Sequence, residues 1–224
     1  KKKMSTAVFV FGRFNPPTIG HEKLINALIA TNQREGGTCL VYGSHTQDSR
    51  TNPLTHTQKF KYLQKMFPRH KKHFKSNSKA KTALEVAVEL NGKYDKLIMV
   101  VGSDRVSDFS SLLNTYNGKK SKHGFYEYKE IDIVSAGERD PDAEGVTGMS
   151  ASKMRAAAAS GDYESFALGL PDTYKDGERL YKDIRLGMNI REQLKPFKPV
   201  AEMNSIEFIR EQYFQNLIYN IGDW

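Results

Sequence analysis

The chain has 224 residues, a length that fits one large domain or one domain carrying an extension. Its 38% of hydrophobic and 27% of charged residues are typical of a globular protein and exclude a largely disordered or a collagen-like chain. The formal net charge of +8 favours an anionic partner, and the longest apolar runs, near 7–11 and 97–101, fall far short of the roughly 18 residues of a membrane span.

The single cysteine, Cys39, cannot form an internal disulfide and lies in an apolar stretch that reads as a buried strand. This favours a reducing compartment, and we expect a cytoplasmic protein without a membrane partner. The three lysines at 1–3 precede too short an apolar run for a signal peptide, so we interpret them as a basic tail before the first strand.

Strand and helix patterns alternate along the chain. Short apolar runs predict strands at 6–11, 38–43, 96–101 and 126–134. Apolar stripes at helical spacing predict helices at 19–31, 54–67, 79–91, 105–117 and 150–160. Such alternation predicts an α/β fold, a Rossmann-like open parallel sheet with helices on both faces.

The regular pattern weakens after Pro171. We therefore expect an α/β domain at 1–171 and a mainly helical C-terminal extension at 172–224 that packs on it or contacts a partner. The extension contains a strong amphipathic helix at 204–219, whose apolar stripe suits a homo-oligomer or a larger assembly. The Gly-rich acidic segment 135–148 is interpreted as a solvated loop or a lid, although its Asp140, Asp142 and Glu144 could suggest a metal site.

The positive charge is concentrated in the segment 59–81, which carries nine Lys or Arg residues and no Asp or Glu. We call it the basic segment. Phe60, Leu63 and Phe67 follow helical spacing, so the lysines of helix 54–67 are expected on its solvated face. A solvated helix face explains the charge, and a patch that binds nucleic acid through its phosphates is the alternative.

The segment that joins the first strand to the first helix is Phe11-Gly12-Arg13-Phe14-Asn15-Pro16-Pro17-Thr18-Ile19-Gly20-His21. Ligands of open α/β sheets bind at the carboxyl ends of strands, where a helix N-terminus attracts phosphate. Gly12 would let a phosphate approach the backbone, and Arg13 is a fork-shaped donor. Thr18 and His21 are expected to face one pocket, with His21 donating to phosphate oxygens whose charge grows as a bond breaks. A histidine that only closes the helix start is the alternative.

A second cluster opens the helix at 150–160. Ser150, Ser152, Lys153 and Arg155 would place two hydroxyls and two cations at a helix N-terminus, which makes a second phosphate cradle. A serine N-cap followed by exposed basic residues is the alternative. The two clusters together could grip one polyphosphate from both sides.

These residues resemble the nucleotidyltransferase superfamily that carries an (H/T)xGH motif near its start and an S-x-(S/T)-x-x-R motif near its end. The motifs read here Thr18-Ile19-Gly20-His21 and Ser150-Ala151-Ser152-Lys153-Met154-Arg155. The chain is more narrowly similar to archaeal-type and phage-borne nicotinamide mononucleotide adenylyltransferases, through Gly12-Arg13-Phe14-Asn15-Pro16, Gly43-Ser44-His45-Thr46 and Asn52-Pro53-Leu54-Thr55. The resemblance covers roughly 6–160. It departs from the common pattern at Thr18, where the adenylyltransferases often carry His, and at Ala151.

The resemblance implies transfer of an adenylyl group from ATP to nicotinamide mononucleotide, which yields NAD and pyrophosphate without a covalent enzyme intermediate. It implies Mg²⁺ held mainly by the nucleotide phosphates. The implied catalytic residues are His21, Thr18, Arg13, Lys153 and Arg155. The implied nucleotide-binding residues are Gly12, Phe14, Asn15, Gly20, Gly102, Asp104, Ser150 and Ser152. The implied second-substrate residues are His45 and Asn52.

Several alternatives stay open. Asp104 follows a predicted strand and would reach a ribose by the resemblance, or it caps a helix. His45 and Asn52 could be ordinary loop polarity. A related enzyme could use another acceptor, such as phosphopantetheine or a phosphorylated alcohol with CTP. A non-catalytic protein could keep the fold and bind nucleic acid through the basic segment. If the chain is phage-encoded, its compartment is the host cytoplasm.

Overall fold

A four-stranded parallel sheet organises the chain, in the order β2-β1-β3-β4. The computed structural model describes residues 4–137 and 149–190. The strands are β1 (Thr6–Gly12), β2 (Thr38–Gly43), β3 (Lys96–Val101) and β4 (Glu130–Ser135). The predicted α/β fold class is thereby confirmed, since every strand pair is parallel.

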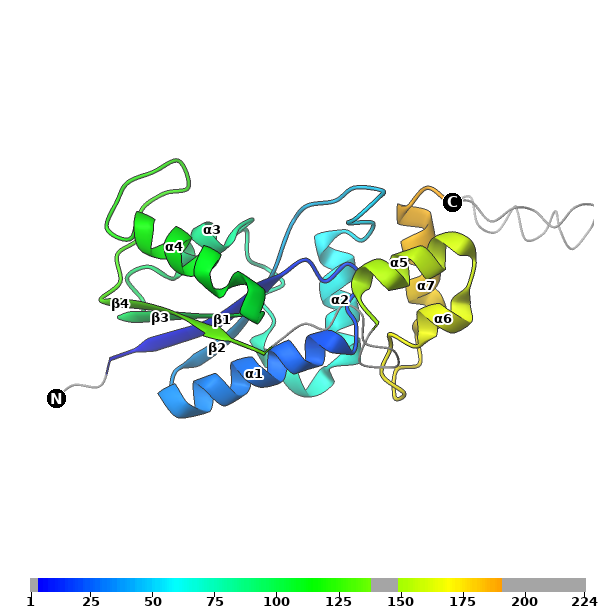
Figure 1. Ribbon diagram of the computed structural model, residues 1–224, viewed down its shortest axis with the longest axis horizontal. Coiled ribbons are helices and arrows are strands. Elements are labelled where there is room, and N and C mark those ends of the chain that lie inside the picture. Colours follow the sequence, from blue (N-terminus) through cyan, green and yellow to red (C-terminus); the bar gives the residue numbers. More distant parts are fainter. Residues whose placement is uncertain (1–3, 138–148, 191–224) are drawn as a thin grey trace, which may run out of the picture. The chain divides into compact units, whose positions relative to one another are not determined.

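The two faces of the sheet are covered by different helices. Figure 1 shows α3 (Ala83–Leu90) and α4 (Val106–Tyr116) over one face and α1 (Gly20–Glu35) against the other. Side chains alternate along β1, so that Val8 and Val10 pack on the α1 side while Ala7 and Phe9 pack on the α3 side. Because both faces are buried, the strands are continuous apolar runs.

The remaining helices stand near the carboxyl ends of the strands (Figure 1). They are α2 (His56–Met66), α5 (Ala151–Ser160), α6 (Tyr163–Ala167) and α7 (Gly177–Gly187), with short 3₁₀ turns η1 (Pro68–His73) and η2 (Ser103–Arg105). Thr55 begins α2 with a capping box, in which its hydroxyl accepts from the Gln58 amide and the Gln58 side chain accepts from the Thr55 amide. The helix predicted at 150–160 is confirmed as α5, which ends at Gly161, a left-handed residue with φ 81°.

Three predicted elements differ from the structure by about four residues at one end. The helix predicted at 79–91 begins only at Ala83, after its N-cap Thr82. The helix predicted at 19–31 continues to Glu35 and ends at the left-handed Gly36. The strand predicted at 126–134 begins only at Glu130. Before it, the backbone amide and carbonyl of Tyr128 pair with the side chain of Asn117 at 2.9 and 3.0 Å, which takes the place of a strand ladder.

Helix α7 lies in the part of the sequence expected to form the extension. The compact unit that holds the sheet ends at Ile190, so it includes α7. Tyr62 of α2 donates a hydrogen bond to Asp183 of α7, and Arg185 of α7 donates to the Ala158 carbonyl of α5. Helix α7 therefore packs on α2 and α5.

Some sequence predictions lie outside the described residues. These are the helix at 204–219 and the carboxylates Asp140, Asp142 and Glu144. Among residues 4–137 and 149–190, no helix is both long and apolar enough to cross a membrane.

Candidate active site

The segments that follow β1 and β2 meet at the carboxyl edge of the sheet. Strand β1 has β2 on one side and β3 on the other, so the chain reverses its direction of winding there, which is where open α/β sheets bind ligands. A cleft of about 560 Å³ lies at this edge. Its lining comes from the ends of β1 and β2, from the start of α3 and from α4: Phe11, Arg13, Ser44, Thr46, Asp48, Thr51, Asn52, Lys81, Thr82, Ala83, Leu84, Phe109 and Leu112.

The turn after β1 is built around the buried ring of Phe14. Phe14 has φ 47°, a left-handed backbone that a phenylalanine rarely adopts, and its side chain is buried. A Cβ added to Gly12 would lie 2.8 Å from this ring. The glycine is thus required by Phe14, a contact that the sequence did not predict. The ring also meets His21 edge-on, with 4.8 Å between the two centroids. Phe14 therefore supports His21 from within the fold.

Thr18 fixes the orientation of His21. The Thr18 amide donates a hydrogen bond to Nδ1 of His21 at 2.9 Å, and the Thr18 hydroxyl lies 3.2 Å from the same nitrogen. Since Nδ1 accepts a hydrogen bond, the proton of the neutral ring lies on Nε2. The Thr18 side chain is buried, and Gly20, which lies between the two residues, opens α1. The structure thus brings Thr18 and His21, which were predicted to face one pocket, into direct contact.

Asn15 connects the turn after β1 to the segment before α2. Its side-chain amide donates to the Leu54 carbonyl at 3.1 Å, and its Oδ1 accepts from the Leu54 amide at 2.8 Å. Both ends of the side chain are therefore used within the fold, and Asn15 positions the two loops. Arg155 of α5 donates to the Asn15 backbone carbonyl at 2.8 Å, across 140 positions of sequence. The structure thus joins the first motif to the second.

The other residues of the second motif lie at the start of α5. The Ser150 hydroxyl accepts from the Lys153 amide at 3.2 Å, so Ser150 is the N-cap. The hydroxyls of Ser150 and Ser152 lie 2.9 Å apart. Ser152 and Lys153 are exposed. The N-cap alternative for Ser150 therefore holds, while the exposed side chains beside it stay accessible to a ligand.

Asp48 organises the loop after β2, which the sequence did not predict. Its carboxylate accepts from the amides of Arg50 and Thr51 at 2.9 and 2.6 Å and from the Asn52 side chain at 2.6 Å. These bonds hold the pKa of the Asp48 carboxyl far below its usual range, and the Asn52 amide is the largest cause. Asn52 is 4% exposed, and its Oδ1 has no hydrogen-bond partner among the described residues. An aspartate followed by polar residues at this spacing is the signal that could have revealed the loop.

His45 lies beside the same loop. One of its ring nitrogens, Nε2, lies 3.1 Å from the Ser78 carbonyl, and its ring stacks on His56 with centroids 3.8 Å apart. Burial, together with the charges of His45 and Lys59, lowers the pKa of His56 to about 4. His45 is half-buried, so its ring is only partly accessible.

Lys59 corrects the expectation that the lysines of helix 54–67 face solvent. Its side chain is 0% exposed, and its Nζ donates to the carbonyl of Ser44 at 2.7 Å and to the Ser44 hydroxyl at 3.1 Å. Burial is the largest cause of a pKa lowered to about 8, and the nearby Arg13 adds to it. Lys59 lies four residues before Leu63, so the helical stripe itself was the missed signal.

Two arginines add to the positive charge at this edge. Burial and the charge of Arg13 lower the pKa of Arg155, whereas Asp48 opposes this shift. Arg13 therefore acts electrostatically on both Lys59 and Arg155, and the Asp48 carboxylate offsets its effect on Arg155. An anion bound here would relieve the repulsion.

Gly102 and Asp104 follow β3, the neighbour of β1. The Gly102 carbonyl accepts from the Arg105 amide at 3.0 Å, which closes the turn η2. Asp104 lies exposed inside that turn. Its side chain caps neither η2 nor α4, so the N-cap alternative for Asp104 was wrong. Its carboxylate remains accessible at the carboxyl edge.

A family model described as cytidylyltransferase-like matches residues 9–157. The match covers about two thirds of the chain and includes both motifs and the loop of Asp48. No curated protein matches the chain. Since one family model spans the sheet and the two joined motifs, the chain belongs to the cytidylyltransferase-like family of nucleotidyltransferases.

Proposed function

We propose that the chain transfers an adenylyl group from ATP to nicotinamide mononucleotide, forming NAD and pyrophosphate. The cleft lies at the sheet edge where nucleotides bind in open α/β folds. It is lined by Arg13 and Asn52, which belong to two of the segments that resemble the adenylyltransferases. The family membership supports nucleotidyl transfer, and these residues support the choice of a phosphate-bearing acceptor.

In this mechanism the acceptor phosphate attacks the α-phosphorus in line. A new P–O bond forms while the bond between the α- and β-phosphates breaks, and pyrophosphate leaves with the electron pair. The acceptor phosphate is ionised near neutral pH, so no residue needs to remove a proton from it. The protein positions the two reactants and neutralises their charge.

His21 supplies a hydrogen-bond donor to the phosphates. Thr18 occupies Nδ1, so the ring presents Nε2–H, which suits an oxygen whose negative charge grows during transfer. Arg13 and Lys153 add positive charge, and Arg155 with Ser150 and Ser152 would hold the β- and γ-phosphates. Asp104 would bind ribose hydroxyls of the nucleotide. His45 and Asn52 would contact the acceptor.

Mg²⁺ is the cofactor of this proposal. The described residues contain no group of three or more His, Cys, Asp or Glu side chains that could hold a metal ion. Mg²⁺ is commonly bound through substrate phosphates and water, a mode that needs no such group, so the residues present fit an ion that arrives with the nucleotide. When bound, it would neutralise charge on the leaving pyrophosphate.

The contact between Arg155 and the Asn15 carbonyl carries this proposal most directly. It brings the C-terminal motif to the turn that holds Thr18 and His21. A polyphosphate could then contact both motifs at once. The alternative, a serine N-cap followed by solvated basic residues, does not explain why Arg155 is half-buried and contacts this turn.

The test is pyrophosphate release by the purified protein with Mg-ATP or Mg-CTP and a panel of acceptors. The panel contains nicotinamide mononucleotide, phosphopantetheine and a phosphorylated alcohol. Release with ATP and the mononucleotide, with NAD formed, would support the whole proposal. Release with another nucleotide and acceptor would support nucleotidyl transfer but with other substrates. No release with any pair, from protein shown to be folded, would overturn the proposed function.

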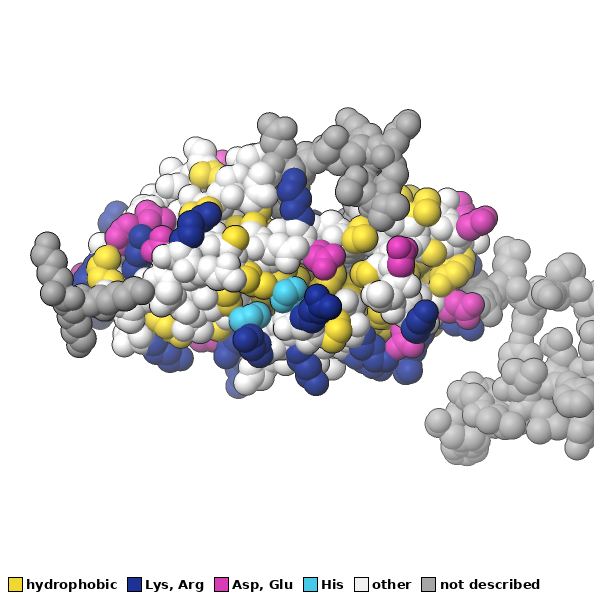
Figure 2. Space-filling model, turned by 90° about the horizontal axis from the view of Figure 1, so that it is seen from below, with side chains coloured by type: hydrophobic (Ala, Val, Ile, Leu, Met, Phe, Trp, Pro, Cys, Tyr) yellow, Lys and Arg dark blue, Asp and Glu magenta, His cyan; other side chains and the backbone are white. Residues whose placement is uncertain are grey.

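A second candidate function is nucleic-acid binding through the basic segment. Within the described part of the chain, Arg69, Lys71, Lys72 and Lys79 are exposed and form no ion pair. Figure 2 shows lysine and arginine side chains gathered along one edge of the face it draws. Neutralising Lys71, Lys72 and Lys75 should weaken a complex with DNA or RNA and flatten its salt dependence. Binding that does not respond to salt would exclude this candidate.

A further inference from the structure

Lys59 is a buried cation that the proposed chemistry does not use. Its Nζ lies within hydrogen-bond distance of two oxygens, both of Ser44. No carboxylate of the described residues lies within 4.0 Å of it. Lysines are rarely buried unless they are paired, because an ammonium loses its hydration there. The nearby Arg13 has the same sign of charge and adds to the cost.

The hydrogen bonds of Lys59 determine what Ser44 can do. An ammonium only donates, so the Ser44 hydroxyl oxygen accepts from Lys59. The Ser44 amide is already used, because it donates to the Gly12 carbonyl at 2.9 Å. The hydroxyl proton of Ser44 has no acceptor among the described residues. Ser44 lines the cleft, so the cleft is where this proton can find a partner.

The charges of the cleft favour an anion as that partner. Arg13 and Lys81 line it as cations, and Asp48 lines it as an anion. The Asp48 carboxylate is already engaged by donors of its own loop. Lys59 adds a further positive charge directly behind Ser44. A phosphate group would accept from Ser44 and balance the buried ammonium.

We propose that Lys59 is a positioning residue that holds the Ser44 hydroxyl so that it donates to a phosphate oxygen of the ligand in the cleft, and that this phosphate balances the Lys59 charge. The inference rests on the proposed function for the identity of the ligand, the phosphate-bearing acceptor. It adds Ser44 and Lys59, which lie outside both motifs, to the residues that bind the acceptor. An acceptor without a phosphate should bind poorly at Ser44.

The variants that test this assignment are Ser44→Ala, Lys59→Met and Lys59→Arg. Lys61→Met is the matched control, because Lys61 is an exposed lysine of the same helix. With ATP and nicotinamide mononucleotide, Ser44→Ala and Lys59→Met should raise the KM for the acceptor about tenfold, since each loses a charge-assisted or hydroxyl hydrogen bond. Lys59→Arg should recover part of this loss, and Lys61→Met should match the wild type. An unchanged acceptor KM in folded Ser44→Ala and Lys59→Met would overturn the assignment.

A second measurement is independent of turnover. The affinity for inorganic phosphate, measured by calorimetry on protein checked by circular dichroism, should fall about tenfold in Ser44→Ala and Lys59→Met. If no acceptor supports turnover but phosphate binding falls in both variants, the proposed function fails and the Lys59 assignment stands. If turnover is present while phosphate affinity is the same in all variants, or absent in the wild type, the assignment fails alone. Ser44→Ala decides the question if Lys59→Met does not fold.

Discussion

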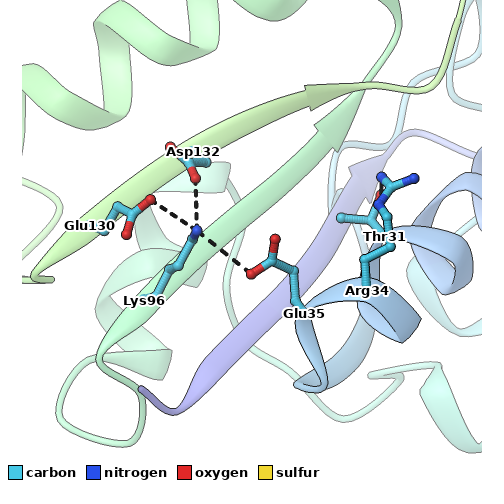
Figure 3. Close-up of polar contacts among 6 residues, drawn as sticks. All are labelled: Thr31, Arg34, Glu35, Lys96, Glu130 and Asp132. Carbon is cyan, nitrogen blue, oxygen red and sulfur yellow. Dashed lines mark hydrogen bonds and ion pairs between the residues drawn. The ribbon is translucent and has the colours of Figure 1, made fainter. Parts of the chain in front are cut away.

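Two lysines at opposite edges of the sheet differ in whether carboxylates surround them. Lys96 opens β3 at the amino edge and is surrounded by Glu130 at 2.9 Å, Asp132 at 2.9 Å and Glu35 at 3.6 Å (Figure 3). Lys59, near the carboxyl edge, contacts Ser44 and has no carboxylate within 4.0 Å among the described residues. Hydrogen bonds to its carboxylates raise the pKa of Lys96 above its usual 10.5, whereas burial lowers that of Lys59.

The difference separates charge that serves stability from charge that serves a ligand. At the amino edge the carboxylates outnumber the lysine, so its charge is satisfied inside the fold. At the carboxyl edge Arg13 disfavours the charge of both Lys59 and Arg155, and among the described residues Asp48 offsets this only at Arg155. A fold that leaves cations uncompensated at one edge sacrifices stability there, and proteins commonly do this at functional sites.

The strongest test of the comparison is His21→Ala, which should lower turnover by ~10²-fold or more by removing a donor to the transferring phosphates. The fold should persist, because the buried partner Phe14 remains. Pyrophosphate release and a thermal melt measure the two effects. His123→Ala is the control, since His123 lies between α4 and β4, away from the carboxyl edge. Equal turnover in both variants would contradict the active-site assignment.

Arg155→Lys should have the next largest effect. A lysine cannot donate to the Asn15 carbonyl and a phosphate with one planar fork, so kcat/KM for the nucleotide should fall about 10- to 30-fold. Arg34→Lys is the matched control, because Arg34 lies at the far end of α1 and donates to Thr31 only weakly, at 3.4 Å. Steady-state kinetics with varied nucleotide measure the change. A loss no larger than that of Arg34→Lys would mean that the two motifs do not act together.

The amino edge is tested by Lys96→Met. This variant leaves Glu35, Glu130 and Asp132 facing one another without their cation, and we expect the free energy of unfolding to fall by about 1–2 kcal/mol at pH 7. Urea unfolding measures it. The control is Lys129→Met, which removes a solvent-screened pair with Asp95 and should lower the free energy of unfolding less than Lys96→Met does. Turnover should be unchanged in both variants.

The parts of the fold predicted from the sequence were those with local signals. The apolar runs of β1, β2 and β3 and the position of the first motif between β1 and α1 agree with the prediction. The strand expected to start at Tyr126 was wrong in its first residues, because Asn117 pairs with the Tyr128 backbone from 11 positions away. Alternation in sequence cannot reveal a side chain that replaces a ladder.

The contacts among the predicted site residues could be inferred from the sequence only where they are local. Thr18 and His21 are three residues apart, and their contact follows from a helix start. The bonds of Asn15 to Leu54 and of Arg155 to Asn15 join positions 39 and 140 residues apart, so only the folded chain reveals them. Lys59 was missed for another reason. A lysine side chain is expected to face solvent because of its charge. This expectation took precedence over the position of Lys59 on the buried stripe of the helix.

The most specific test of the comparison is the pH dependence of the free energy of unfolding. The pKa of Lys59 is about 8 in the folded protein and near 10.5 when unfolded, so between these values the unfolded chain binds more protons and the free energy of unfolding rises with pH. Lys96 changes the free energy of unfolding in the opposite direction, and it does so above pH 10.5. Its raised pKa gives stability that is full below 10.5 and is lost only above it.

Urea unfolding of wild type and Lys59→Met at pH 8, 9 and 10 should therefore isolate Lys59, because other titrating groups cancel in the difference. The wild type should gain about 2 kcal/mol relative to the variant over this range. Inorganic phosphate should reduce that gain, since an anion beside Ser44 favours the charged lysine and moves its titration to higher pH. If the difference in the free energy of unfolding between the two proteins does not change with pH, the charge of Lys59 does not destabilise the fold. The contrast between Lys96 and Lys59 would then be wrong.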